Sequence, residues 1–141
     1  MPYNSEAIRP MALALIKNDK NQILVSPGYD PALKKNFYRL LGGGIEFGET
    51  SLAALRREFR EELGVELANC KLLDITENIF SFNDLPGHEL DFIYQADFAD
   101  SSNYQKSSFN ILDSGYEGQA IWLDLTDLEN TIIYPNISAW L

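Results

Sequence analysis

The feature that most constrains this chain is a glycine-rich bend followed directly by a segment with helical periodicity. Gly42, Gly43 and Gly44 stand just upstream of residues 50–63, where apolar side chains recur every three or four positions. Gly64 follows as a typical C-terminal cap. The pattern predicts a helix over residues 50–63 with a buried stripe formed by Leu52, Leu55, Phe59 and Leu63.

A second arc of the predicted helix carries three carboxylates, Glu58, Glu61 and Glu62. Like charges at these spacings repel each other and weaken a helix. A hard divalent cation offsets this repulsion, and Mg2+ is expected, with Mn2+ as a substitute. The alternative is a solvated acidic face. The glycine bend favours the metal, because glycine lets the backbone approach a ligand and its carbonyls can join the ion's shell.

The composition is that of one globular domain spanning residues 1–141. Hydrophobic residues make up 45% of the chain, enough for a sizeable core. The net charge of −10 argues against nucleic-acid polymers and anionic membranes as partners, because both require a basic surface. The charge is uneven, since residues 1–42 carry +3 and residues 66–141 carry −11. The basic first segment is compatible with a small anionic ligand.

Two residue types that occur once exclude several kinds of site. Cys70 is the single cysteine, which rules out an intrachain disulfide and favours a core position. His88 is the single histidine, which rules out a multi-histidine metal site. Residues 1–10 show no signal-peptide pattern, and no apolar run approaches the length of a membrane helix. We therefore expect a cytoplasmic protein.

Short apolar segments on both sides of the helix predict strands. Residues 11–16 and 22–25 are expected to form a hairpin around a turn at 18–21. The other strand-like segments are residues 37–41, 70–74, 90–96 and 120–123. Strands around one central helix predict a mixed α/β domain.

Polar stretches rich in proline or glycine predict the loops. Residues 27–36 are expected to be a loop, and the polar residues 100–118 a longer one. Residues 125–141 are expected to hold a short helix before Pro135.

The bend and the helix together fit a known pattern, the Nudix box G-x5-E-x7-R-E-U-x-E-E-x-G-U, in which U is bulky and apolar. Every specified position is filled here, by Gly43, Glu49, Arg57, Glu58, Phe59, Glu61, Glu62, Gly64 and Val65. Over residues 43–65 the chain thus resembles the Nudix hydrolase family. The resemblance implies a single Nudix hydrolase domain over residues 1–141, with a mixed β-sheet in an α/β/α sandwich. It also implies Mg2+- or Mn2+-dependent hydrolysis of a nucleoside diphosphate linked to another group.

The same resemblance assigns roles to residues of the box. Glu58, Glu61 and Glu62 are similar to the family's metal ligands, and the Gly42 carbonyl corresponds to a backbone ligand. Arg57 resembles the residue that orients Glu58, with Glu49 as its partner. Pairs of this kind fix the direction of metal-binding carboxylates.

Many family members take one further carboxylate from a later loop. Glu117 begins a Glu-Gly-Gln triplet five residues before Trp122, which resembles the triplet of the mutator-preventing member that cleaves oxidised dGTP. Glu117 is therefore predicted to be an additional metal ligand or the general base, and the alternative is an ordinary acidic residue of the loop. Glu89, beside His88, is the alternative for this role, and Glu58 is a further choice of base.

The residues before the glycines supply substrate contacts. Arg39 is predicted to reach the outer phosphates, whereas Lys34 and Lys35 are more typical of solvated bases. Three aromatic residues are candidates for stacking on a nucleobase or for the core, namely Phe37, Tyr38 and Phe82.

The markers of three substrate subgroups of the family, those for ADP-ribose, dinucleoside polyphosphates and coenzyme A, are absent from this sequence. Phe80 stands where an ADP-ribose subgroup has proline, and residues 81–83 lack the tyrosine of a dinucleoside-polyphosphate subgroup. The substrate therefore stays open among small nucleotides, and a nucleotide-binding sensor module without turnover is the alternative function. The resemblance also makes a homodimer a possible assembly.

Overall fold

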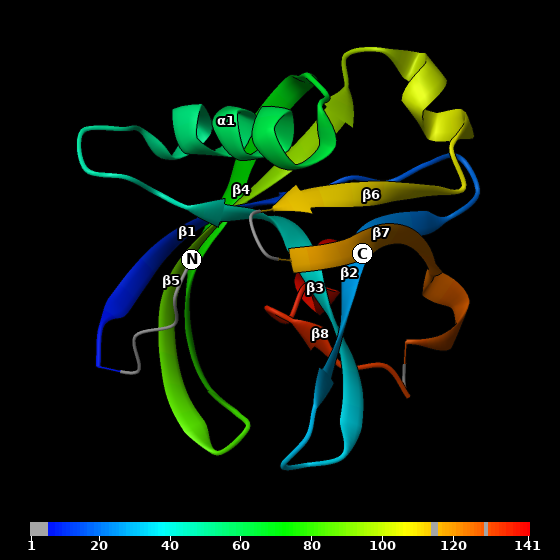
Figure 1. Cartoon of the computed structure of the whole chain (residues 1–141). Helices are drawn as coiled ribbons and strands as arrows, with labels where there is room; N and C mark the ends of the chain where they lie inside the picture. The colour runs from blue at the N-terminus through cyan, green and yellow to red at the C-terminus, as the bar shows by residue number, and fades with distance from the viewer. Residues whose placement is uncertain (1–5, 114–115, 129) are drawn as a thin grey trace.

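The computed structural model describes residues 6–113, 116–128 and 130–141. One helix, α1 (Ser51–Leu63), lies on a strongly twisted mixed sheet (Figure 1). The strands are β1 (Ile8–Leu15), β2 (Gln22–Asp30), β3 (Lys35–Gly44), β4 (Leu67–Phe82), β5 (Leu85–Phe98), β6 (Ser108–Asp113), β7 (Tyr116–Asp124) and β8 (Ile133–Tyr134). Three 3-10 helices complete the described elements, η1 (Ser101–Gln105), η2 (Leu125–Asp127) and η3 (Ser138–Trp140). No helix among the described residues is long and apolar enough to cross a membrane.

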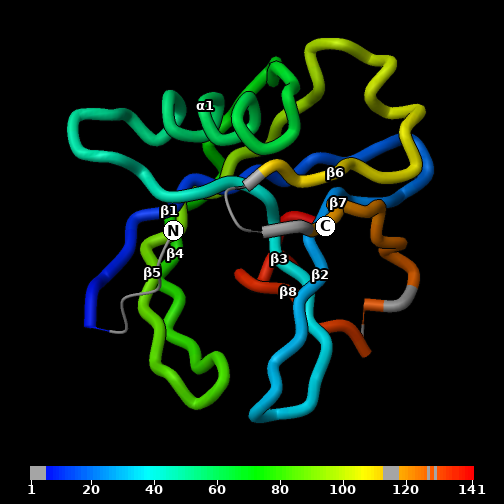
Figure 2. The backbone as a smooth tube through the Cα atoms, viewed as in Figure 1, coloured from blue at the N-terminus to red at the C-terminus, as the bar shows by residue number. Residues whose placement is uncertain are grey.

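The strand order in the sheet is β4-β5-β1-β3-β2-β7-β6, and β8 pairs with β3. β1 runs parallel to β5 and antiparallel to β3. The β2–β3 and β4–β5 hairpins extend from the sheet on the side away from α1 (Figure 2). The predicted mixed α/β sheet is thus confirmed.

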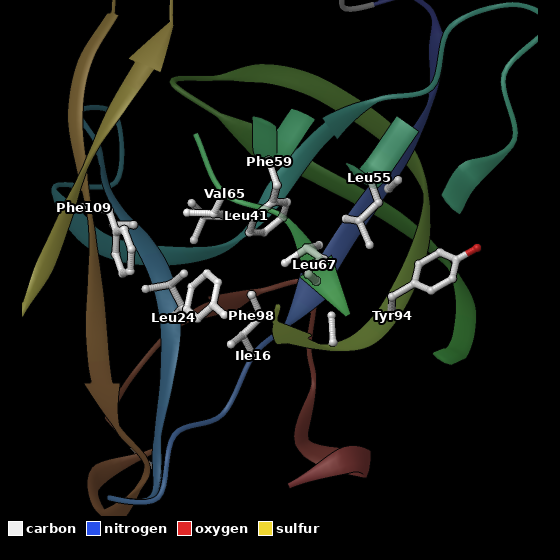
Figure 3. Close-up of a cluster of buried hydrophobic side chains, with 14 of the residues drawn as sticks. Ile16, Leu24, Leu41, Leu55, Phe59, Val65, Leu67, Tyr94, Phe98 and Phe109 are labelled. Atoms are coloured by element: carbon white, nitrogen blue, oxygen red, sulfur yellow. The ribbon is translucent and has the colours of Figure 1, made fainter. Parts of the chain in front are cut away.

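α1 has clear chemical signals at both ends, and the predicted helix is confirmed. The Thr50 side chain accepts a hydrogen bond from the Ala53 N–H at 3.1 Å, which satisfies one of the free donors of the first turn. Gly64 ends the helix in the left-handed conformation, with φ of 66°. Leu55 and Phe59 are buried beneath it. Figure 3 shows these two side chains pointing into a cluster with Leu41, Val65 and Leu67.

Different elements pack against the two faces of the sheet. The first core cluster lies under α1 and contains Leu55 and Phe59. The second cluster lies on the opposite face, where the C-terminal segment contributes Ile137 and Trp140 against Met11, Leu13 and Ile93. In the described residues, the outer layer on this second face therefore consists of a segment with short 3-10 helices. The short helix expected before Pro135 is η2 within this segment.

The predicted hairpin of residues 11–16 and 22–25 is only partly correct. Leu24 N–H donates to the Ile16 carbonyl at 3.1 Å and Lys17 bridges to Ile23, so the turn forms. Beyond it β1 and β2 diverge, and β3 pairs with β2 through residues 35–40 and with β1 through residues 41–44. The insertion of β3 is a long-range pairing, which a local turn signal does not encode.

The predicted loop at 27–36 is wrong, because β2 and β3 occupy most of it. Pro27 lies beyond the end of the β2–β7 ladder, so its missing N–H costs little on the open side of β2. Gly28 is required by packing, since a Cβ atom there would collide with the Phe37 ring.

The predicted loop at 100–118 is wrong in the same way. It contains η1, β6 and the first residues of β7. In β6, buried Phe109 and Ile111 alternate with exposed Asn110 and Leu112, a strand pattern too short to stand out in a polar context.

Candidate active site

The end of β3 passes directly beneath the arc of α1 that carries Glu58, Glu61 and Glu62, called the acidic arc below. A Cβ atom built on Gly43 would collide with Cδ and both carboxylate oxygens of Glu58. Gly42 has φ of 148°, and a Cβ atom there would collide with the backbone oxygen of Ala12 in β1. The absence of a side chain at Gly43 therefore lets the Glu58 carboxylate rest against the backbone, and its absence at Gly42 lets β3 lie close to β1.

Arg57 connects the glycine bend, the loop before α1 and the acidic arc. Its Nε and Nη2 donate to the two carboxylate oxygens of Glu49 at 2.8 and 2.9 Å. Nη2 also donates to the Gly44 carbonyl at 3.0 Å. Nη1 donates to Glu58 at 2.9 Å and to Glu61 at 3.3 Å. One planar guanidinium thus sets the direction of two carboxylates of the helix.

The contact with Arg57 stabilises the charged forms of both partners. The guanidinium, through its hydrogen bonds, lowers the pKa of Glu49 to about 2, and the Glu46 N–H adds to the effect. Conversely, the hydrogen bond to Glu49 is the main cause that raises the pKa of Arg57. Glu49 therefore stays ionised throughout the neutral range and keeps the guanidinium in place.

The acidic arc offers oxygen ligands, although its carboxylates are not gathered around one point. In the described part of the chain, no three His, Cys, Asp or Glu side chains converge on a possible metal position. Glu58 and Glu61 turn toward Arg57, and Glu62 lines the adjacent cleft together with Gly42. Carboxylate oxygens on one helix face, close to a glycine backbone, nevertheless fit a hard divalent cation. The metal assignment of these residues stays a prediction.

A cleft of about 760 Å3 opens beside the acidic arc. Its volume lies within the roughly 300–1,000 Å3 of typical small-molecule sites. The wall follows β3 from Asn36 to Gly42 and includes Phe37 and Arg39. Glu62 of α1 and Phe82 of β4 also line it, together with residues of β1, β2 and β6. Two of the predicted substrate-binding residues, Arg39 and Phe82, thus share one cleft with Glu62.

A smaller pocket, called the inner pocket below, lies between the β2–β3 and β4–β5 hairpins and holds about 60 Å3. Arg39, Phe37 and Phe82 line both it and the cleft. The Phe37 ring meets Phe82 edge-on, with 6.0 Å between the ring centroids, and Tyr134 at 5.6 Å. Phe80 and Tyr134, which also line it, were not predicted as site residues. The alternation of Asn78, Phe80 and Phe82 along β4 was the available signal.

A buried charged cluster lies behind Arg39. Nη2 of Arg39 donates to both carboxylate oxygens of Glu89, at 3.0 and 3.1 Å. The Glu89 side chain is 1% exposed. Asp91 on the same strand is completely buried, and neither of its carboxylate oxygens has a hydrogen-bond partner among the described residues. Burial, reinforced by the Glu89 carboxylate, raises the pKa of Asp91 to about 7. Glu89 is therefore engaged in an interior ion pair.

The remaining predicted residues are more dispersed. Tyr38 packs against the second core cluster and is not in the wall of the cleft as described. Lys34 is exposed in the turn between β2 and β3, whereas the exposed Lys35 borders the inner pocket. Glu117 lies in β7 opposite Leu112, and its side chain is outside the described part of the structure.

Comparison with known proteins assigns the chain to a family. The sequence model of the NUDIX domain matches residues 7–141. The chain belongs to the NUDIX domain family. This NUDIX domain is 34% identical over 87 residues to an RNA pyrophosphohydrolase of Ruthia magnifica subsp. Calyptogena magnifica, covering 62% of this chain and 46% of that protein. It is 41% identical over 73 residues to the nucleoside triphosphatase NudI of Escherichia coli, covering 52% and 50%. The matches thus span about half the length of these curated relatives.

Solved structures of NUDIX proteins share the fold. The MutT NUDIX hydrolase from Burkholderia pseudomallei superimposes with a TM-score of 0.63 at 23% identity, over 92% of both chains. A NUDIX hydrolase from Nitrosomonas europaea gives a TM-score of 0.61 at 20% identity, over 87% of this chain and 76% of that one. The predicted NUDIX fold is thereby confirmed.

Proposed function

We propose that this protein is a Mg2+-dependent pyrophosphohydrolase that cleaves the diphosphate of a nucleoside diphosphate linked to another group. Nucleoside triphosphates and nucleotide-sugars are substrates of this kind. The observation that carries the proposal is the contact set of Arg57, which ties Glu49, Glu58 and the Gly44 carbonyl together next to a nucleotide-sized cleft. The relatives named as an RNA pyrophosphohydrolase and a nucleoside triphosphatase support pyrophosphohydrolase activity and differ in the substrate that their names give.

NUDIX hydrolases in general use divalent metal ions. We propose Mg2+, with Mn2+ as a substitute, held by Glu58, Glu61, Glu62 and the Gly42 carbonyl. When bound, such an ion neutralises diphosphate charge and lowers the pKa of a coordinated water. Glu117 on β7 is proposed as an additional ligand or base.

The chain's own residues supply orientation and proton transfer. Arg57 holds Oε1 of Glu58 at 2.9 Å, while the carboxylate rests on Gly43. Oε2 of Glu58 is therefore the oxygen that we assign to accept a proton from the attacking water, unless Glu117 performs this step. The ionised Glu49 keeps the guanidinium from turning away from Glu58.

The charge of the chain favours small nucleotides over polymers as substrates. The net charge of −10 opposes the phosphate backbone of a nucleic acid, which is bound through a basic surface. A single nucleotide that carries its own metal ion brings far less uncompensated charge. The expected cytoplasmic location and homodimer remain predictions.

A substrate panel tests the proposal directly. Nucleoside triphosphates, ADP-ribose, nucleotide-sugars and dinucleoside polyphosphates are incubated with the full chain and Mg2+, and the nucleotide product and the phosphorylated leaving group of each reaction are measured by chromatography. We expect turnover of at least one class and its loss when EDTA removes the metal. Tight binding of one nucleotide without any turnover would contradict the proposal and favour a sensor module.

A further inference from the structure

Arg39 stands where the part of a substrate remote from the reacting phosphates would lie. It precedes Gly42 by three positions in the extended strand β3, which corresponds to roughly 10 Å. Its side chain is 36% exposed and borders both the cleft and the inner pocket. If the diphosphate lies at Gly42 and Glu62, Arg39 therefore faces the other end of a nucleotide.

The donors of Arg39 are only partly used by the protein. Nη2 is held by Glu89, while Nε and Nη1 donate to none of the described residues. A buried carboxylate restricts the guanidinium to one orientation, because moving away would leave the Glu89 charge unpaired in the interior. Arg39 borders the cleft in this orientation, so the N–H groups that Glu89 leaves unused can donate to a ligand there, and the side chain can accept no hydrogen bond.

The charge around Arg39 disfavours a phosphate group as the partner of these donors. The guanidinium is already neutralised by Glu89, and the carboxyl group of Asp91 lies beside that pair without a hydrogen-bond partner among the described residues. The three groups together carry no net positive charge in either protonation state of Asp91. An added phosphate would meet no compensating charge, whereas a neutral acceptor would use the donors without repulsion.

The surroundings of Arg39 favour a flat, apolar ring. Phe37 and Phe82 line the cleft and the inner pocket together with Arg39. Aromatic rings of this kind stack on nucleobases, and a base placed against them would direct one edge at Arg39. A guanidinium binds two neighbouring acceptors through two N–H groups on one edge, here Nε or Nη1 together with the second N–H of Nη2. O6 and N7 of guanine are such a pair of acceptors, whereas adenine presents a donor next to N7.

We propose that Arg39, held in position by Glu89, is a specificity-determining residue that selects nucleotides with a 6-oxopurine base, such as guanine, over those with adenine. This inference rests on the proposed function. Glu89 acts here as a positioning residue, because it reaches the base only through Arg39.

The test compares kcat/KM of the full chain for GTP, ITP, 7-deaza-GTP, ATP and CTP in Mg2+. GTP and ITP share O6 and N7, so both should exceed ATP by about tenfold or more. 7-deaza-GTP lacks N7 and should fall toward ATP. Equal values for GTP and ATP, or a preference for ATP or CTP, would overturn the inference while leaving the proposed function intact. If triphosphates are poor substrates, GDP-glucose and ADP-glucose provide the same comparison.

Variants assign the preference to Arg39. In Arg39→Gln, the GTP/ATP ratio should fall to near one, mainly through a higher KM for GTP, with kcat little changed. Because this variant leaves Glu89 unpaired, the double variant Arg39→Gln/Glu89→Gln is measured beside it, and circular dichroism verifies the fold. Lys20→Gln removes a charge in the exposed turn between β1 and β2 and should keep the wild-type ratio. A guanine preference that persists in folded Arg39 variants would refute the assignment.

The inference remains testable if none of these nucleotides is hydrolysed. In that case the substrate panel alone decides the proposed function, and dissociation constants for GTP and ATP are measured by titration calorimetry instead. Tighter binding of GTP that depends on Arg39 would support the inference. Equal binding of the two nucleotides would overturn it.

Discussion

Arg57 and Glu49 form a two-point ion pair, with Nε–Oε2 and Nη2–Oε1 distances of 2.8 and 2.9 Å. The pair connects the loop before α1 to the middle of the helix. The same guanidinium reaches the Gly44 carbonyl and the Glu58 carboxylate. The position of Glu58 therefore depends on the flat shape of the arginine head group as well as on its charge.

Arg57→Lys tests this dependence on shape. Lysine keeps the positive charge but cannot donate in two parallel directions, so Glu58 loses its fixed orientation. We expect kcat to fall by about 10–100-fold and the Mg2+ concentration for half-maximal rate to rise. Arg60→Lys is the matched control, because Arg60 pairs with Glu66 on the surface, where both side chains are more than half exposed. Wild-type rates and Mg2+ dependence in Arg57→Lys would show that the guanidinium does not orient Glu58.

The neighbouring glycines give opposite predictions for activity and stability. In Gly43→Ala the three atoms nearest to the new Cβ belong to the flexible end of Glu58, so the fold should persist while Glu58 is displaced and hydrolysis falls by about 10–100-fold. In Gly42→Ala the Cβ meets the Ala12 backbone at a φ of 148°, and stability should drop by about 2 kcal/mol or more. Urea unfolding and initial rates of both variants check this. Full activity of Gly43→Ala would contradict the role given to the Gly43–Glu58 contact.

Glu62→Gln tests the metal assignment. The substitution keeps the size of the side chain but removes the charge that we assign to the cation, and hydrolysis should fall by about 100-fold or more. Rates are measured over a range of Mg2+ and Mn2+ concentrations at matched circular dichroism. Glu66→Gln, which removes an exposed charge just beyond α1, should retain activity. An active, folded Glu62→Gln would exclude Glu62 as an essential ligand.

Asp91 predicts a specific dependence of stability on pH. Its pKa of about 7 in the folded protein lies above the ordinary value of 3.8, so the folded state binds a proton that the unfolded state has released. The stabilisation of the folded state by the protonated Asp91 is complete below about pH 4, and it is lost as the pH rises through about 7. Between pH 5 and pH 8 the wild type should therefore lose on the order of 2–3 kcal/mol relative to Asp91→Asn.

Urea unfolding of both proteins at the two pH values measures this difference. Asp19→Asn, in the exposed turn after β1, is the control and should follow the wild type. Parallel pH profiles of the wild type and Asp91→Asn would show that Asp91 is not protonated in the folded state.

The helix and the acidic arc were predictable because their determinants are local. Apolar spacing, the Gly64 cap and the glycine bend lie within a few residues of one another, and helical geometry then places Glu58, Glu61 and Glu62 on one arc. The Arg57–Glu49 pair was predictable from the family resemblance. The structure added the Gly44 carbonyl and Glu61 as further partners of Arg57.

The mistakes in the fold concern pairings between distant segments. The turn at 18–21 predicted that β1 and β2 pair, but β3 separates them after the first bridge. β6 was missed because its two buried side chains, Phe109 and Ile111, alternate over too few residues. Strand formation in both cases depends on a partner far along the chain, whose position a local pattern does not contain.

The sequence by itself determined the family, the mixed α/β class and the acidic helix, because each follows from short-range spacing. Only the tertiary structure decided how Arg39 is used. Its partner Glu89 is 50 positions away, and the two meet because the β2–β3 and β4–β5 hairpins extend from the same side of the sheet. The aromatic walls and the buried Asp91 depend on the same arrangement. Strand order and burial set the environment of these side chains, and neither is encoded in local periodicity.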